Sequence, residues 1–163
     1  KGLPKNFSCL DLTAGFGKDA LEISKIVNCK SLILVEKEAW VFELLVDGIK
    51  KTSSSRADNL LKKFKVFNMD GLEFLELKNE TFDLVYIDPM FLGVQKSKAK
   101  KHMQALRDLS SAEIQKQFLK TSLKFANHRV IVKRHKNMEY LEGIVPNRSV
   151  IGKVVRYDIY YTS

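Results

Sequence analysis

A glycine-containing segment near the start of the chain carries the first residues suited to chemistry. It runs from Asp11 through Gly15 and Gly17 to Lys18 and Asp19, between a predicted strand and a predicted helix. Glycines at these positions let the backbone turn sharply and approach a ligand closely, and the free amides at the start of the next helix attract an anionic group. We therefore interpret the segment as a cofactor-binding loop.

The same loop fits two kinds of cofactor. Gly15, Gly17 and Ala20 have the spacing of a dinucleotide-binding fingerprint. Glu36, at the end of the second predicted strand, lies where that fingerprint places a carboxylate for the ribose, and it could equally be a negative charge at the start of the next helix. The loop alone therefore does not separate a nicotinamide-dependent enzyme from one that uses S-adenosylmethionine (SAM).

A second segment favours SAM and a flat, amine-bearing substrate. The fourth predicted strand ends in Asp88 and Pro89, followed by Phe91, at the edge where open α/β sheets bind ligands. The ring of Phe91 can stack on a base, while the carboxylate of Asp88 and the carbonyls of the proline turn accept the hydrogens of an exocyclic amine. Hydride transfer has no need for such a group. We predict Asp88, Pro89 and Phe91 as catalytic residues.

Basic residues follow this segment and predict contacts with RNA phosphates. Four lysines and no acidic residue occur between residues 95 and 107, and two further basic residues end the fifth predicted strand. The chain as a whole has 28 Lys and Arg against 19 Asp and Glu, a net charge of +9, which is typical of proteins that bind polyanions. The predicted RNA contacts are Lys96, Lys98, Lys100, Lys101, Lys133 and Arg134.

Length and composition exclude several other classes of protein. A chain of 163 residues has the length of one domain, and its 45% hydrophobic content argues against disorder. The apolar runs fall short of the ~20 residues of a membrane helix. The only cysteines, Cys9 and Cys29, lie in apolar surroundings, and no zinc-site spacing occurs. We expect one cytoplasmic domain over residues 1–163, without a metal or a membrane partner.

Apolar strand-length segments alternate with helical patterns along the chain, which predicts an α/β fold with a mostly parallel sheet. The tail from Ser149 to Thr162 is β-rich, and we expect it to form an antiparallel C-terminal edge with a turn near Gly152 and Lys153. The predicted strands are Ser8–Thr13, Ser31–Glu36, Lys65–Met69, Phe82–Asp88 and Arg129–Lys133, and the predicted helices are Lys18–Val27, Glu38–Lys51 and Ser111–Phe125.

Two predictions concern packing rather than chemistry. In the second predicted helix, Trp40, Val41, Leu44, Leu45 and Gly48 lie on one stripe, as in an amphipathic helix. In the tail, the segment 156–158, with the sequence Arg-Tyr-Asp, is expected to support the edge of the sheet rather than to take part in chemistry.

Ordered motifs along nearly the whole chain carry a family resemblance. They include Asp11 to Asp19, Glu36-Lys37, Asp88-Pro-Met-Phe91, Val132-Lys-Arg134 and Arg156-Tyr-Asp-Ile-Tyr160. This set resembles the RsmJ family of bacterial small-subunit (16S) ribosomal RNA guanine-N2 methyltransferases. The resemblance implies a Rossmann-like, class I SAM-dependent methyltransferase fold. It also implies SAM contacts at Lys18, Asp19, Glu36, Lys37, Asp70, Gly71 and Asp88.

The chain departs from the family pattern at some of these positions. The family tends to carry Arg at positions 18 and 37, and Lys keeps the charge but lacks the planar fork. The family also tends to carry a Ser pair where Asp70 and Gly71 stand. Asp70 could accept a hydrogen bond from the adenine amine or cap a following helix. A family N-terminal region is expected to be missing from this sequence.

From the residues and the resemblance together, we predict a SAM-dependent methyltransferase that modifies the N2 amine of a guanosine in 16S ribosomal RNA. Its expected partner is ribosomal RNA or the small ribosomal subunit. Three alternatives remain open: an NAD-dependent oxidoreductase, a SAM-dependent methyltransferase for a small molecule or a protein, and a non-enzymatic RNA-binding module with a decayed cofactor site.

Overall fold

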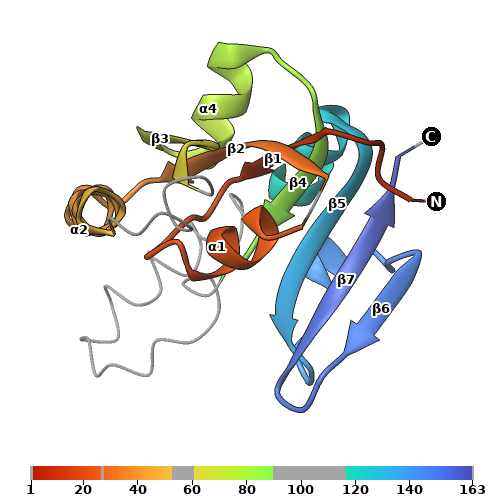
Figure 1. Cartoon of the computed structure of the whole chain (residues 1–163). Helices are drawn as coiled ribbons and strands as arrows, with labels where there is room; N and C mark the ends of the chain where they lie inside the picture. Colours follow the sequence, from red (N-terminus) through yellow and green to blue (C-terminus); the bar gives the residue numbers. More distant parts are fainter. Residues whose placement is uncertain (1, 27, 53–60, 90–116, 163) are drawn as a thin grey trace.

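The computed structural model describes residues 2–26, 28–52, 61–89 and 117–162. They contain a seven-stranded sheet in the order β3-β2-β1-β4-β5-β7-β6 (Figure 1). The strands from β1 to β5 pair in parallel, while β7 pairs antiparallel with both β5 and β6. The strands are β1 (Phe7–Asp11), β2 (Cys29–Glu36), β3 (Phe64–Asn68), β4 (Phe82–Ile87), β5 (Ala126–His135), β6 (Arg148–Ile151) and β7 (Val155–Tyr161).

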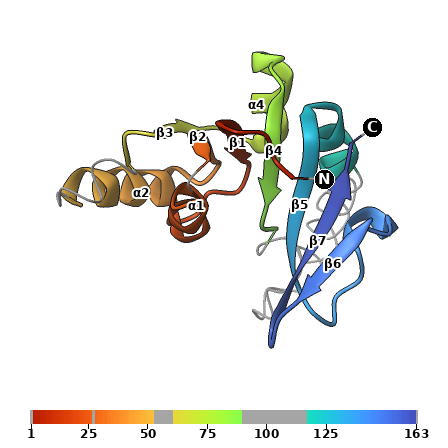
Figure 2. The same ribbon diagram turned by 45° about the vertical axis from the view of Figure 1, so that its right-hand side comes forward.

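Helices cover both faces of this sheet. The helices α1 (Lys18–Ser24) and α2 (Ala39–Lys51) lie on one side, and α4 (Gly71–Lys78) lies on the other (Figure 2). Residues 117–124 are also helical, and a short 3-10 helix spans Leu141–Gly143. Among the described residues, no helix combines the length and apolar character needed to cross a membrane.

The alternating side chains of the central strands build two separate cores. Leu10 of β1 and Val85 of β4 pack in one core with Phe74 of α4. Their neighbours Cys9 and Leu84 belong to the other core, on the side of α1 and α2. A strand buried on both faces has to be apolar at successive positions, which explains the continuous apolar runs. The same alternation assigns each polar residue at a strand end to one side of the sheet.

The predicted α/β fold and its antiparallel C-terminal edge are confirmed. All five predicted strands are present, and the tail forms β6 and β7 around a turn at residues 152–154. Helix α4 was not among the predicted helices. The predicted helix Ser111–Phe125 is helical over residues 117–124, and its first six residues lie outside the described part of the chain.

The predicted helix with the apolar stripe is present as α2, but only part of the stripe is buried. Val41 and Leu45 are buried, as expected. Trp40 and Leu44 are 59% and 53% exposed. Each of these exposed residues precedes a buried one. Successive helical residues are rotated by about 100°, so this helix buries a narrower stripe than the five apolar and small residues would cover.

Candidate active site

The glycine loop between β1 and α1 has a backbone that requires its glycines. Gly15 and Gly17 have φ angles of +53° and +75°, in the left-handed region. A Cβ atom on Gly17 would also lie 2.7 Å from Cδ1 of Leu45 in α2. The loop is tied to its neighbour β2, because the amide of Ala14 donates to the carbonyl of Val35 at 2.9 Å. The predicted tight turn is therefore present at the carboxyl edge of the sheet.

Glu36 lies against this loop, as the ribose hypothesis requires. One carboxylate oxygen accepts a hydrogen bond from the amide of Gly15 at 2.8 Å, and the other accepts from the amide of Glu38 at 2.8 Å. The residue is 8% exposed. Each oxygen retains a further lone pair for a hydroxyl group. The structure thus gives Glu36 a role in holding the loop, and its contact with ribose stays a prediction.

Asp70 and Gly71 each have a structural explanation. The Asp70 side chain caps α4 by accepting from the amide of Leu72 at 2.9 Å. Gly71 is buried, and a Cβ atom there would lie 3.0 Å from the carbonyl oxygen of Leu12 and 3.1 Å from the ring of Phe118. The helix start thus approaches the end of β1 closely. The capping alternative for Asp70 is confirmed, and SAM contacts by this pair stay a prediction.

The segment that begins with Asp88 and Pro89 after β4, here called the acceptor segment, contacts the glycine loop through Thr13. The amide of Asp88 donates to the Thr13 hydroxyl at 2.6 Å, and the amide of Thr13 donates to the Asp11 carboxylate at 3.0 Å. Pro89, directly after Asp88, is buried. Two loops that are about 70 residues apart in sequence therefore share one rim of the sheet.

Lys133 joins the two loops more directly. Its ammonium nitrogen lies 2.8 Å from the carboxylate of Asp19 and 2.9 Å from the carboxylate of Asp88. The Tyr86 hydroxyl donates to the same oxygen of Asp19 at 2.8 Å. The side chains of Lys133, Asp19 and Asp88 are 17%, 25% and 12% exposed, so this cluster is largely withdrawn from water.

Burial and, after it, the neighbouring charges shift several pKa values in this cluster. Burial raises the pKa of Asp11 to about 7, with a further contribution from the nearby charges of Asp19 and Asp88. Burial also raises the pKa of Asp88, while the ammonium group of Lys133 opposes the rise. For Lys133, burial alone would lower the pKa, but the bonds to Asp19 and Asp88 prevail and raise it. The cluster thus holds three carboxyl groups and one ammonium group, which contacts Asp19 and Asp88.

The sequence reasoning did not bring Lys133 into this cluster. It treated Lys133 as a phosphate contact because of its basic neighbours, and that role stays a prediction. The missed signal was the alternation of side chains. Val130 and Val132 pack in the core on the α4 side, so Lys133 points to the opposite side, like Tyr86 and Asp88. Arg134, the neighbouring candidate, donates to the backbone carbonyl of Glu139 at 3.1 and 3.3 Å.

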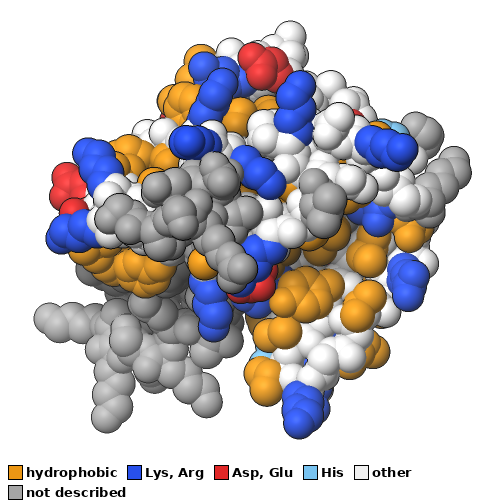
Figure 3. Space-filling model, in the orientation of Figure 1, with side chains coloured by type: hydrophobic (Ala, Val, Ile, Leu, Met, Phe, Trp, Pro, Cys, Tyr) orange, Lys and Arg blue, Asp and Glu red, His pale blue; other side chains and the backbone are white. Residues whose placement is uncertain are grey.

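The remaining predicted residues divide into two groups. Lys18 and Lys37 are exposed at the ends of the elements that carry the site. Phe91 and the basic run lie outside the described residues, and their predicted roles stay predictions; the basic run comprises Lys96, Lys98, Lys100 and Lys101. On the face seen in Figure 3, Lys and Arg side chains are spread widely between few acidic ones.

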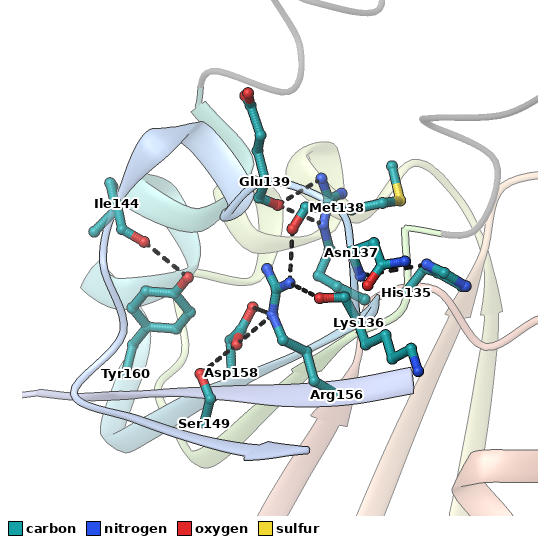
Figure 4. A network of polar contacts seen from close by, with 11 residues as sticks. His135, Lys136, Asn137, Met138, Glu139, Ile144, Ser149, Arg156, Asp158 and Tyr160 are labelled. Atoms are coloured by element: carbon teal, nitrogen blue, oxygen red, sulfur yellow. Dashed lines mark hydrogen bonds and ion pairs between the residues drawn. The ribbon is translucent and has the colours of Figure 1, made fainter. Parts of the chain in front are cut away.

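Away from this rim, the predicted support at the sheet edge is confirmed (Figure 4). Asp158 is fully buried and accepts from Nε of Arg156 at 2.9 and 3.0 Å and from the Ser149 hydroxyl at 2.6 Å. Arg156 also donates to the carbonyls of Lys136 and Met138. The pair therefore fastens the segment after β5 to the antiparallel edge.

The strand order, the parallel β1–β5 pairing and the antiparallel β7 define a Rossmann-like class I methyltransferase fold, with its candidate site at the carboxyl edge of β1 and β4. Residues 2–162 match the model of the family described as "Putative SAM-dependent methyltransferase". The chain belongs to this family. Family membership gives SAM as the cofactor and decides between the two cofactors that the glycine loop left open.

Two curated relatives and one solved structure are also similar to this chain. Ribosomal RNA small subunit methyltransferase J of Hydrogenovibrio crunogenus is 33% identical over 157 residues, covering 93% of this chain and 56% of the relative. The protein of the same name from Coxiella burnetii is 35% identical over 153 residues, covering 93% and 59%. A SAM-dependent methyltransferase from Neisseria gonorrhoeae superposes with a TM-score of 0.79 at 25% identity, covering 96% and 62%. The chain thus spans less than two thirds of the length of these relatives.

Proposed function

We propose that residues 1–163 act as one methyltransferase domain that transfers the methyl group of SAM to the exocyclic N2 amine of a guanosine in small-subunit (16S) ribosomal RNA. The observation that carries this proposal is the contact between the glycine loop and the acceptor segment. Asp19 from one and Asp88 from the other lie within 2.9 Å of the same ammonium nitrogen. A donor and an acceptor bound to these two loops would therefore be neighbours.

The charge of the cluster fits SAM. SAM carries a positive sulfonium and a positive ammonium group, whereas the pyrophosphate of a dinucleotide is negative. A largely buried cluster with three carboxylates and one lysine favours a cationic ligand. Asp19 and Asp88 would face the charged end of the cofactor, and Glu36 would face its ribose. When bound, SAM supplies the activated methyl group for the reaction.

The chain's own residues then have to hold the amine in line with that methyl group. Alignment at near-attack distance supplies most of the rate enhancement in such a transfer. The N2 lone pair of guanine is delocalised into the ring, so the amine is a weak nucleophile. A hydrogen bond from the amine to the Asp88 carboxylate favours the pyramidal nitrogen and offsets its developing positive charge. Pro89 fixes the turn that presents this carboxylate, and Phe91 would stack on the base.

Ribosomal RNA as the substrate is supported by the relatives and by charge. The curated relatives are named small-subunit ribosomal RNA methyltransferases, and the net charge of +9 suits a polyanion. The basic run at residues 96–101 would grip phosphates next to the target nucleotide. Both cysteines are buried free thiols, in keeping with a reducing compartment. We accordingly assign the reaction to the cytoplasm, on free RNA or on the small ribosomal subunit.

The test is methylation of undermethylated small ribosomal subunits and of their extracted RNA with methyl-labelled SAM, followed by nucleoside analysis. We expect label on N2-methylguanosine, and none with the variant Asp88→Asn. RNA binding should weaken steeply with salt, because phosphate contacts release counterions. Label on adenosine, on cytidine or on no RNA would refute the proposal.

A further inference from the structure

We propose that Lys133 is a positioning residue for the methyl transfer, which holds Asp88 oriented and ionised and ties it to Asp19 on the cofactor side. This inference rests on the proposed function and assigns a role to a residue that the cofactor and acceptor motifs do not include. It differs from the phosphate contact expected from the sequence.

The geometry of Lys133 leaves little freedom for another role. Its ammonium group lies between two carboxylates, at 2.8 Å from Asp19 and 2.9 Å from Asp88, and its side chain is only 17% exposed. An ammonium group has three protons, and two of them are used in these bonds. A phosphate would have to compete with two carboxylates that are already in contact. The side chain therefore acts inside the site rather than on its outer surface.

The contacts also define what Lys133 does for Asp88. The carboxylate of Asp88 is 12% exposed. The charged groups around it are the acids Asp11 from β1 and Asp19 from the start of α1, and the base Lys133 from β5. Tyr86 of β4 is a neutral hydroxyl in the same cluster. Burial and the neighbouring acids favour a protonated Asp88, and Lys133 opposes them. A protonated Asp88 loses the negative charge that would offset the charge developing on the amine.

The bridge has a second consequence for the two halves of the site. Asp19 belongs to the start of α1, which follows the glycine loop, whereas Asp88 belongs to the turn after β4. Without Lys133, two acids would face each other in a largely buried space and repel. The lysine therefore sets both the spacing of the two loops and the direction in which each carboxylate points.

The first experiment measures the charge state of Asp88 directly. Protein labelled with ¹³C at the aspartate carboxyl groups is titrated by NMR, and the Asp88 signal is assigned by its loss in Asp88→Asn. We expect the pKa of Asp88 to be at least one unit higher in Lys133→Met than in the unmodified protein. Lys65→Met, which removes an exposed lysine of β3, serves as the control and should leave the pKa unchanged. An unchanged pKa in Lys133→Met would overturn the inference.

The second experiment follows methyl transfer as a function of pH. In Lys133→Met, the acid side of the kcat profile should move to higher pH, with a loss of about tenfold per unit of pKa rise when measured below that pKa. KM for SAM should change less than kcat. Lys133→Arg keeps the charge and should recover part of the rate at the original pH. A lower rate with an unchanged pH profile and no recovery in Lys133→Arg would indicate a merely structural role.

Two outcomes separate this inference from the proposed function. If the unmodified protein transfers no methyl group to RNA, the proposed function fails while the NMR titration still measures the effect of Lys133 on Asp88. If methyl transfer occurs and the pKa of Asp88 does not depend on Lys133, only the inference fails. Should Lys133→Met not fold, as judged by circular dichroism, the titration is repeated in the background Asp11→Asn, which removes one of the unopposed acids.

Discussion

Two clusters of charged residues lie on neighbouring strands of this sheet, one at the ends of β1, β4 and β5 and the other on β7, which pairs with β5, and they differ in their charge balance. At the β6–β7 edge, Arg156 and Asp158 pair with each other, Arg134 lies near enough to feel both charges, and the remaining hydrogen bonds are made to neutral hydroxyl and carbonyl groups. At the rim of β1, β4 and β5, Asp19 and Asp88 contact one lysine, and Asp11 is a third acid near them. The side chains of the Arg156–Asp158 pair are 8% and 0% exposed, and their two charges offset each other. The rim carries an excess of negative charge.

This difference indicates which cluster serves the fold and which serves chemistry. A buried pair that is balanced and hydrogen-bonded has no charge left for a ligand. In an unbalanced cluster, repulsion between like charges lowers the stability of the fold. Such clusters are found in natural proteins mainly at functional sites. The comparison therefore predicts opposite effects of substitution. Loss of an acid at the rim should reduce activity while sparing stability, and loss of Asp158 at the edge should do the reverse.

The largest effect is expected from Asp88→Asn at the rim. Loss of one preorganised charge that acts on the transition state costs about 10²–10³-fold in kcat. Removing one of three crowded acids should at the same time leave the melting temperature unchanged or raise it. Methyl transfer and thermal unfolding measured on the same preparation test both parts. A large fall in melting temperature would mean that the charge of Asp88 stabilises the rim, and would contradict the contrast drawn between the rim and the edge.

The corresponding change at the edge is Asp158→Ala. It leaves the Arg156 guanidinium buried without its carboxylate, and breaking a buried pair in this way costs about 3–5 kcal/mol of the free energy of unfolding. The rate of methyl transfer per folded molecule should stay the same, because Asp158 pairs with Val132, whose side chain lies on the opposite side of β5 from Lys133. Urea unfolding gives the first quantity, and assays well below the unfolding transition give the second.

The double variant Arg156→Met with Asp158→Leu is the control for that experiment. Replacing both partners by apolar groups leaves no unpaired charge, so it should cost much less than the single change. If the double variant is as unstable as Asp158→Ala, the pair contributes through shape rather than through charge. In that case the mutual attraction of the two charges would not be what stabilises the edge.

A smaller effect is expected from Gly17→Ala in the glycine loop. An alanine there has a φ of +75° and a Cβ atom 2.7 Å from Leu45, and the left-handed conformation alone costs about 1–2 kcal/mol. The matched control is Gly48→Ala in α2, where a Cβ atom meets nothing within 4 Å and helix propensity improves. In Gly17→Ala, the free energy of unfolding and the affinity for SAM, measured by calorimetry, should both fall. Gly48→Ala should leave the free energy of unfolding unchanged or raise it. Equal behaviour of the two variants would contradict this view of the loop.

The sequence was most informative about the sheet. The strand Phe82–Ile87 is apolar at almost every position, and only a strand buried on both faces needs such a run. Helix α4 was missed because it has eight residues between two strands, and its start at Asp70 was interpreted as one of two possibilities. In α2, periodicity gave a wide apolar stripe, but the choice between adjacent residues such as Trp40 and Val41 depends on where the sheet ends.

For the site, the sequence predicted the parts but not the connection between them. Gly17 and Asp88 were found because backbone turns leave local signals in glycine and proline. The bridge by Lys133 brings together residues from β5, α1 and β4 that are up to 114 positions apart. That contact depends on the register between strands and on the side of the sheet on which each residue lies. No local pattern contains this information, although the alternation along β5 would have given the side.

The last prediction concerns pH and Asp11 of the rim. Its pKa is about 7 in the folded protein, raised from 3.8 mainly by burial. The folded state therefore binds more protons than the unfolded state between these values, so this group makes the free energy of unfolding fall as pH rises from about 4 to about 7. Asp11→Asn removes the ionisation and should flatten that part of the stability curve. A difference of about 1 kcal/mol corresponds to roughly 2–4 °C in melting temperature for a domain of this size. Thermal melts of both proteins at several pH values between 4 and 8 measure the slopes. The pKa of Asp88 is also raised by burial and gives a slope of the same sign, so Asp11→Asn should remove part of the slope. Identical slopes in the two proteins would contradict a raised pKa for Asp11.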